Sequence, residues 1–454
     1  MTKEKANIGN EPIYDAKTLG TPRMLVLGFQ HLFAMFGATV LVPILTGLSV
    51  SATLLFAGLA TLFMHLVTKK KVPVFLGSSF AFLGGYFAVI ASGAELGLSQ
   101  REALPYACVG VACAGLLYLI LALICKVFGS KNVMRFFPPV VTGPIIIAIG
   151  LILAPSAINN CSTNWLIALV AIVVVIVCNI WGKGMIKIIP ILMGVLISYL
   201  VAAVTGNVDF SGVKEAAWIG LPFQMQDTVF GLFGSGNVNT GLLVSSIVMI
   251  VPIAFATMME HVGDISAISG AIEKNLIEDP GLHRTLIGDG IGTAIAALFG
   301  APANTTYGEN TGVLVLTKVY DSKVVRLAAV YAVVLSFCPK FAALISAMPA
   351  ATIGGVSIIL YGMISAVGVR NMVENHTDFQ KSRNVIVAAV ILGLALGINF
   401  SDAGSISFAV GNMNIALSGL AVASIVGIIL NGILPGKREE FMPNQENSGS
   451  LGKF

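Results

Sequence analysis

The chain has 454 residues, of which 56% are hydrophobic and only 11% are charged, and its net charge is +4. An ordinary globular protein carries about 25% charged residues, so this composition excludes a soluble multidomain protein and a disordered chain. The mean hydropathy of +0.91 is typical of a polytopic membrane protein.

Cysteine spacing and basic clusters give no indication of a disulfide framework or of nucleic-acid binding. The six cysteines lack CxxC spacing and mostly lie in apolar stretches, so we expect them to be reduced packing residues. The run Lys69-Lys70-Lys71 is too short to form a nucleic-acid-binding face. The first 20 residues are polar, and we therefore expect no cleavable signal peptide. We also expect no cofactor and no metal site.

Apolar runs predict 14 membrane-spanning helices in an all-α fold. The first seven are expected at 24–47, 52–68, 73–91, 104–125, 138–155, 164–181 and 188–205. The second seven are expected at 244–269, 286–299, 302–317, 327–347, 350–369, 384–400 and 413–434. The chain then divides into an N-terminal tail, a first seven-span repeat, an extracellular connection, a second repeat and a C-terminal tail, at 1–23, 24–205, 206–243, 244–434 and 435–454.

The distribution of basic residues supports this count. If both termini are cytoplasmic, only Arg101, Lys214 and Lys340 of the 26 Lys and Arg residues fall outside, and the other 23 fall inside. One span more or fewer in the middle of the chain would destroy that alternation, which membrane proteins normally follow. We therefore predict a multi-pass protein of the cytoplasmic membrane with both tails in the cytoplasm.

Seven spans in each half imply that the second half enters the membrane from the opposite side, as inverted repeats do. The third span of each half is rich in Gly, Ser, Thr and Asn, at residues 77–80 and 304–310. Such backbone is tolerated at membrane depth only where it is buried or lines a cavity. We expect a short extended segment in each of these spans, followed by a half-helix whose free N–H groups point at a shared midplane site.

Three acids lie in apolar context, where an ionisable group costs roughly 2.5–3.5 kcal/mol on insertion scales. Glu260 and Asp264 share a face of the eighth predicted span, and Glu309 lies in the tenth. They either converge on a binding or proton-carrying site, or pair with Asn and backbone groups to fix packing. His31 is either a site residue or a core histidine, and Asp289 is expected at a helix end.

Catalytic motifs are missing from the sequence. It has no Walker A loop, no HExxH and no nucleophile elbow, so we do not expect an enzyme or an ATP-driven pump. A channel would normally show a pore loop or rings of charge, and neither is evident. A facilitative uniporter and a binding protein without net flux stay open as alternatives to an ion-coupled transporter.

Several motifs resemble those of the bacterial uracil permeases, within the nucleobase–cation symporter family that also contains xanthine and ascorbate transporters. The similar segments are residues 30–43 (QHLFAMFGATVLVP), 77–82 (GSSFAF), 260–263 (EHVG), 279–284 (DPGLHR) and 304–310 (NTTYGEN). The resemblance extends over nearly the whole chain. It implies two inverted seven-span repeats arranged as a core domain and a gate domain, a homodimer, and elevator-like transport of the substrate.

The resemblance also implies roles for individual residues. Uracil would be bound by the Glu260 and Glu309 side chains, by backbone N–H groups at Phe80 and Gly308, and by the Phe80 ring. Two further residues, Tyr307 and Asn310, would support this shell. The site would be gated by Tyr361 and Ser357 from the twelfth span.

Asp264 departs from the pattern of uracil permeases and is more typical of purine transporters, so a xanthine or other purine symporter is the alternative. Against it, purine transporters usually carry Gln-Asn where this chain has Glu309-Asn310. Uracil is nearly neutral at pH 7, so accumulation requires a co-transported charge, which we expect to be a proton. The candidate proton carriers are Glu260, Glu309, Asp264 and His31.

Overall fold

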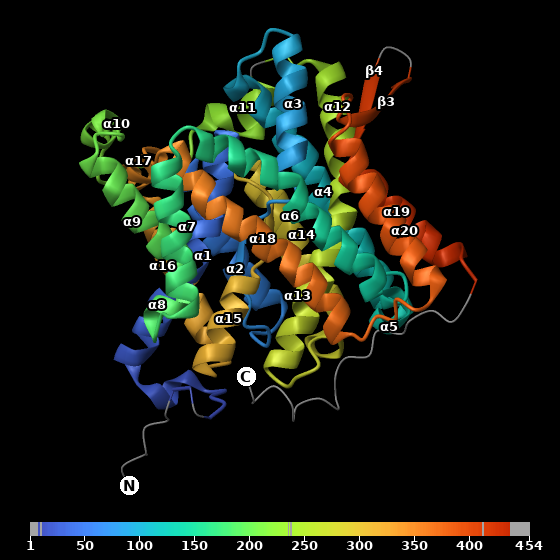
Figure 1. The fold of residues 1–454 in the computed structure, drawn as a ribbon, viewed down its shortest axis with the longest axis horizontal. Coiled ribbons are helices and arrows are strands. Elements are labelled where there is room, and N and C mark those ends of the chain that lie inside the picture. The colour runs from blue at the N-terminus through green and yellow to red at the C-terminus, as the bar shows by residue number, and fades with distance from the viewer. Residues whose placement is uncertain (1–7, 10, 235, 237, 411–412, 436–454) are drawn as a thin grey trace.

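Helices form most of the chain in the computed structural model, which describes residues 8–9, 11–234, 236, 238–410 and 413–435 (Figure 1). The first half contains η1 (Ala16–Leu19), α1 (Thr21–Thr46), α2 (Val50–Val67), β1 (Leu76–Ser78), α3 (Leu83–Glu95), α4 (Gln100–Phe128), α5 (Ser130–Met134), α6 (Pro139–Ser162), α7 (Trp165–Ile180), α8 (Met185–Ile188) and α9 (Pro190–Val204). Apart from residue 435, the predicted C-terminal tail at 435–454 lies outside the described residues.

The connection and the second half of the chain are also mostly helical. The connection contains α10 (Ser211–Glu215), η2 (Met225–Asp227) and α11 (Val229–Gly234). The second half contains α12 (Thr240–Ile250), η3 (Val251–Ile253), α13 (Ala254–Ala271), η4 (Ile277–Gly281), α14 (Leu282–Leu298), β2 (Asn304–Thr306), α15 (Gly308–Thr317), α16 (Ser322–Ser336), α17 (Pro339–Ser346), α18 (Ala350–Glu374), α19 (Ser382–Asn399), β3 (Ser405–Val410), β4 (Met413–Ser418) and α20 (Gly419–Ile433).

Local signals in the sequence set several helix ends. Ser49 caps α2 by accepting a hydrogen bond from the backbone N–H of Ala52. Ser99 and Glu102 form a reciprocal capping box at the start of α4. Helix α1 ends at Gly47, whose φ of 81° is a left-handed conformation that glycine adopts without steric cost.

Within the described residues, seven helical stretches are long and apolar enough to cross a membrane. They are residues 21–46, 50–67, 100–128, 139–162, 240–271, 350–374 and 382–399. Three shorter apolar helices, α7, α9 and α20, lie in other predicted spans. A helical, multi-pass membrane protein is therefore confirmed, whereas the count of 14 spans stays a prediction.

Besides the two spans in which an extended segment was expected, two further predicted spans are not continuous helices. The segment predicted at 327–347 bends by 90° between α16 and α17. Pro339 opens α17 and disfavours helical backbone in the residue before it, so the helix cannot run straight through. The segment predicted at 413–434 begins as strand β4, which pairs antiparallel with β3, and becomes helical only at Gly419. Alternation of polar and apolar residues from Ser405 favours this hairpin.

Helices from the two halves of the chain pack against one another. Helix α6 packs on α18, α4 on α14, and α2 on α16, while α7, α9, α19 and α20 join α6 and α18 in one group. Figure 1 shows α18 crossing the middle of the molecule beside α6. Neither half could bury these faces without the other, so the halves form a single packed structure.

Candidate functional site

The site is built around a two-stranded antiparallel sheet that joins distant parts of the chain. Strands β1 and β2 pair Leu76 with Thr306, Gly77 with Thr305 and Ser78 with Asn304. The pairing extends past each strand, because Ser79 N–H donates to Ala303 O at 2.8 Å and Tyr307 N–H donates to Phe75 O at 3.1 Å. All six strand residues are buried, so this non-helical backbone lies inside the protein.

Polar side chains from neighbouring helices satisfy the outer edges of these strands. Thr61 of α2 accepts a hydrogen bond from Leu76 N–H at 2.9 Å. Thr293 of α14 both accepts from Asn304 N–H at 3.2 Å and donates to Asn304 O at 3.1 Å. Buried backbone without such partners would cost several kcal/mol in an apolar environment. The threonines therefore make extended backbone possible at this depth.

Tyr307 and Gly77 fit against each other at the centre of the sheet. The Tyr307 hydroxyl donates to Ser78 O at 2.9 Å. A Cβ atom at Gly77 would lie 2.5 Å from the Tyr307 ring and 2.7 Å from Thr39 Oγ1, so only glycine fits. This close approach fixes the tyrosine that precedes α15.

Helix α15 begins at Gly308, immediately after this sheet. Its first backbone N–H groups have no partner within the helix, and Glu309 lies in its first turn. Gly308 is exposed, and a Cβ atom added to it would meet no atom within 4 Å. Gly312, one turn later, faces open space in the same way. The start of α15 therefore presents backbone N–H groups and a carboxyl group beside an open volume.

Carboxyl groups from three helices lie close to this point. Glu260 of α13 interacts electrostatically with Asp264 on its own helix, with Asp289 of α14 and with Glu309 of α15. Thr306 Oγ1 of β2 donates a 2.5 Å hydrogen bond to Asp264 Oδ2. The structure thus brings together the three acids that sequence analysis selected, and all three are half-buried.

His31 lies against Asn310 in the interface between α1 and α15. Asn310 Nδ2 donates to His31 O at 2.9 Å and lies 3.1 Å from His31 Nδ1. Both residues are buried. The contacts of His31 with Asn310 orient the first turn of α15 relative to α1.

Phe80 and Tyr361 form the contact between the β1–α3 segment and α18. Their ring centroids are 5.6 Å apart, with the planes inclined by 75° in an edge-on arrangement. Ser357, one helical turn before Tyr361, is fully buried on the same helix. Phe80 also lines a pocket, together with Ala81, Gly84, Ile149, Ile152, Leu153, Ile253, Asn399, Ser418 and Leu420.

Two features of this region were not predicted from the sequence. Asp289 is not at a helix end; it lies within α14, fully buried, with Oδ2 2.8 Å from Nδ1 of the fully buried His261. The apolar context of both residues was an available signal, because an acid buried inside a helix needs a partner. Thr306 was also missed as the donor to Asp264, since their contact depends on tertiary structure.

Residues 22–404 match a family model described as the Permease family. The chain belongs to the Permease family.

Curated relatives of this permease extend over almost its whole length. The uracil permease of Bacillus caldolyticus is 40% identical over 94% of this chain and 96% of its own. The uracil permease of Bacillus subtilis strain 168 is 38% identical over 97% and 98%, and that of Escherichia coli strain K12 is 36% identical over 89% and 90%. These matches confirm the resemblance inferred from the motifs, and all three relatives carry the names of transporters.

Solved structures match the permease at the level of fold. The transmembrane domain of the cyanobacterial bicarbonate transporter BicA aligns with a TM-score of 0.62 and 16% identity, covering 93% of this chain and 99% of that domain. SLC26A9 aligns with a TM-score of 0.64 and 11% identity, covering 92% of this chain and 66% of its own. At these identities the likeness concerns the fold alone.

Proposed function

We propose that this permease takes up uracil across the cytoplasmic membrane together with a proton. The observation that carries the proposal is the convergence of Glu260, Asp264 and Glu309 on the open volume at the start of α15. The names of relatives with 36–40% identity over most of the chain support uracil as the substrate.

The chemistry of the site suits a flat ring with alternating carbonyl and N–H groups. Glu260 and Glu309 accept hydrogen bonds from ring N–H groups when ionised and donate to a ring carbonyl when protonated. The backbone N–H groups at Gly308 and Phe80 supply donors for the other carbonyls, and the Phe80 ring packs on the base. Tyr307 and Asn310 orient this shell through Ser78 and His31.

Proton coupling follows from the neutrality of the substrate. Uracil alone gains nothing from the membrane potential, whereas each accompanying proton contributes about 2.3 kcal/mol per 100 mV. Because a carboxyl group makes different hydrogen bonds in its two protonation states, uracil binding and proton binding are linked reciprocally. Glu260, Glu309 and Asp264 carry the proton in this proposal, and His31 contributes through Asn310.

The transport cycle in this proposal is an elevator-like movement within a homodimer of two inverted seven-span repeats. The core domain contains the helices around β1 and β2, and the gate domain contains α6, α7, α9, α18, α19 and α20. Packing of the latter six helices in one group supports this division. Tyr361 contacts Phe80 of the core from the gate side, and it gates the site together with Ser357 in this proposal. Open space along Gly308 and Gly312 favours access from the end of α15 that the positive-inside rule assigns to the cytoplasm.

The deciding experiment measures radiolabelled uracil uptake into proteoliposomes under an inward proton gradient. We expect gradient-dependent accumulation that excess unlabelled xanthine does not inhibit. Inhibition by xanthine would favour the purine symporter that Asp264 suggests. Equilibration without accumulation, unaffected by the gradient, would show a uniporter or channel and would overturn proton coupling.

A further inference from the structure

The segment before the first helix is bound to the protein along its whole described length. We define residues 11–20 as the N-terminal strap. Every third residue of the strap, Ile13, Ala16 and Leu19, is buried, so one face of the strap packs against the body of the protein. Such a repeated pattern of burial is unusual for a terminal segment, since chain ends are generally poorly ordered unless they are tied down.

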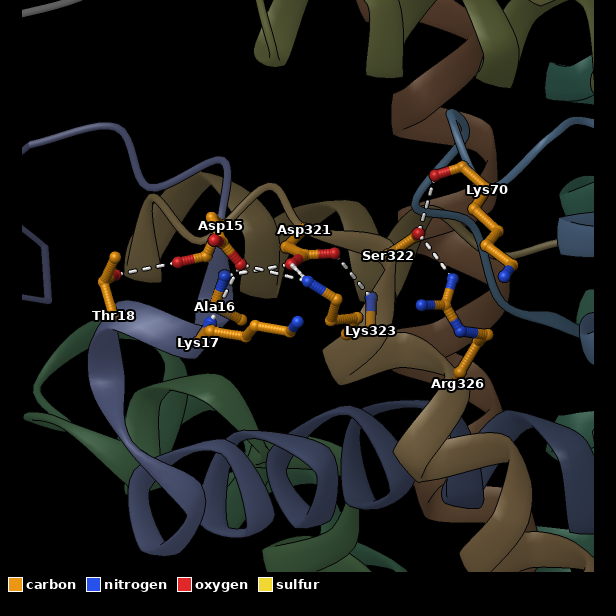
Figure 2. Close-up of polar contacts among 9 residues, drawn as sticks. All are labelled: Asp15, Ala16, Lys17, Thr18, Lys70, Asp321, Ser322, Lys323 and Arg326. Carbon is orange, nitrogen blue, oxygen red and sulfur yellow. Dashed lines mark hydrogen bonds and ion pairs between the residues drawn. The ribbon is translucent and has the colours of Figure 1, made fainter.

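The strap pairs with the connection between α15 and α16 as a short parallel bridge. Ile13 N–H donates to Lys318 O, and Tyr320 N–H donates to Ile13 O, both at 2.8 Å. Ala16 N–H donates to Asp321 Oδ2 at 2.9 Å, and Asp15 pairs with Lys323 Nζ at 3.0 Å (Figure 2). The strap is thereby attached to the end of the helix that carries Glu309.

The same strap also contacts the end of α13. The Tyr14 hydroxyl donates to Ile272 O at 3.0 Å, and Lys274 Nζ lies 4.2 Å from the centre of the Tyr14 ring. Ile272 is the residue that closes α13, the helix of Glu260 and Asp264. Tyr14 is bound at the end of α13, and its neighbour Ile13 is bound to Lys318 at the end of α15. The strap therefore links the two helices whose acids form the site.

The two helices are also joined nearer the site, where Thr306 Oγ1 donates a hydrogen bond to Asp264 Oδ2, but both have open space along part of their length. A Cβ atom added to Gly270 of α13 or to Gly312 of α15 would meet no atom within 4 Å. The end of α16 is connected in turn to the α2–β1 turn, where Ser322 Oγ donates to Lys70 O at 2.7 Å (Figure 2). The strap thus adds a direct link between the ends of α13 and α15, beside the ion pair of Lys71 with Asp279 that joins the α13–α14 connection to the α2–β1 turn.

We propose that the N-terminal strap is a brace that fixes the spacing of α13 and α15 and thereby sets the affinity of the site for its substrate. Tyr14 is its principal positioning residue. This inference rests on the proposed function for the identity of the substrate, but not for the mechanical role of the strap. The strap's hydrogen-bond and ion-pair partners described above lie at the ends of α13 and α15 and at the start of α16, so the strap can move with these helices and need not detach during transport.

The first test compares uracil affinity in three full-length variants. Tyr14→Phe removes only the hydroxyl that reaches α13, Asp15→Ala removes the ion pair with Lys323, and Glu11→Ala is the matched control. Glu11 is an exposed acid of the same strap for which no hydrogen bond or ion pair is found among the described residues. We expect Tyr14→Phe and Asp15→Ala each to raise Kd and KM about fivefold with unchanged Vmax, and Glu11→Ala to match the unaltered protein. Equal affinities in all three variants, or a loss of Vmax at constant KM, would overturn the brace.

The second test needs no substrate, and therefore separates failure of the brace from failure of the uracil assignment. Spin labels at Ala267→Cys on α13 and Leu316→Cys on α15, both exposed, report the distance between the helices after the half-buried Cys113 and Cys338 are replaced by Ala. We expect a single narrow distance distribution, which broadens when Tyr14→Phe and Asp15→Ala are combined. An unchanged distribution would overturn the proposal, whereas absence of uracil binding by the unaltered protein would instead reject the proposed substrate.

Discussion

Thr306 Oγ1 donates a hydrogen bond of 2.5 Å to Asp264 Oδ2 and so ties strand β2 to helix α13. This bond makes the position of one acid depend on the sheet that ends at the start of α15. The Thr306 hydroxyl thereby links α13, which carries Glu260 and Asp264, to the strand that leads into α15 and Glu309.

Replacing Thr306 with valine tests that alignment, because valine has nearly the same shape but no hydroxyl. A lost hydrogen bond to a carboxylate costs about 1.5–3 kcal/mol, so we expect uracil affinity to fall roughly ten- to hundredfold. Thr306→Ser retains the hydroxyl and should bind nearly as well as the unaltered protein. Titration calorimetry of both variants checks this; equal affinities for Val and Ser would show that the bond does not align the site.

Glu309→Gln separates hydrogen bonding from ionisation. The amide keeps the shape of the side chain but cannot release a proton, so we expect uracil binding to be partly retained and proton-driven accumulation to be lost. Exchange of labelled for unlabelled uracil across the membrane, which needs no net proton movement, should persist. Intact accumulation against a gradient in this variant would reject Glu309 as a proton carrier.

Gly308 and Gly77 should respond to alanine in opposite ways. The Cβ of Gly308→Ala enters open space, so we expect normal thermal stability and at least tenfold weaker uracil binding, because the methyl group occupies the substrate volume. The Cβ of Gly77→Ala would lie 2.5 Å from the Tyr307 ring, so we expect a loss of stability of about 1–3 kcal/mol. Thermal unfolding and uracil binding, measured on both variants, check the contrast. Unimpaired binding by Gly308→Ala would place the substrate elsewhere.

His261 and Asp289 should contribute to the stability of the fold only when both are present. A buried polar group that loses its partner costs about 1–3 kcal/mol, and more if it is charged, whereas replacing both partners with apolar residues can be nearly neutral. We therefore expect Asp289→Leu to lower the unfolding temperature more than the double variant His261→Leu/Asp289→Leu does. If the two changes were additive, the 2.8 Å contact would carry no coupling energy.

Docking of the N-terminal strap should depend on pH through Asp15. The ion pair with Lys323 and the hydrogen bond from Lys17 N–H lower the pKa of Asp15 below its usual value of 3.8. A carboxyl group with a lowered pKa stabilises the docked form above about pH 4, and this contribution is lost as the pH falls through the lowered value. Hydrogen exchange of residues 11–20 should thus be unchanged between pH 7 and 5 and faster near pH 3, after correction for the intrinsic rate. The Asp15→Ala variant should lack this step.

Much of this fold could be predicted from local composition. The contacts between residues that are distant in the sequence could not. Long apolar runs predict helices such as α1, α4 and α6, because burial in lipid requires them. The Gly- and Ser-rich segments predict extended backbone, and β1 and β2 lie there. By contrast, the β3–β4 hairpin and the bend before Pro339 interrupt apolar stretches, and a hydropathy reading treats such stretches as uniform helices.

The candidate site shows the same division. Glu260, Asp264 and Glu309 could be found because each is an acid in apolar sequence, where it requires a reason. Two other contacts could not be predicted, the hydrogen bond of Thr306 to Asp264 and the binding of the strap through Tyr14. Threonine and tyrosine are ordinary residues until tertiary structure places them beside a carboxyl group or a helix end.

The pairing of β1 with β2 also has a consequence for biosynthesis. Strand β1 ends at Ser78, and its partner begins only at Asn304, so more than 200 residues must be inserted into the membrane before the sheet can close. Until then the backbone of β1 has no strand partner in a region where water is scarce, and α2 and α4 lack the helices that cover them. The nascent permease therefore passes through a long stage in which its first half is inserted but incomplete, and the substrate site forms late in synthesis.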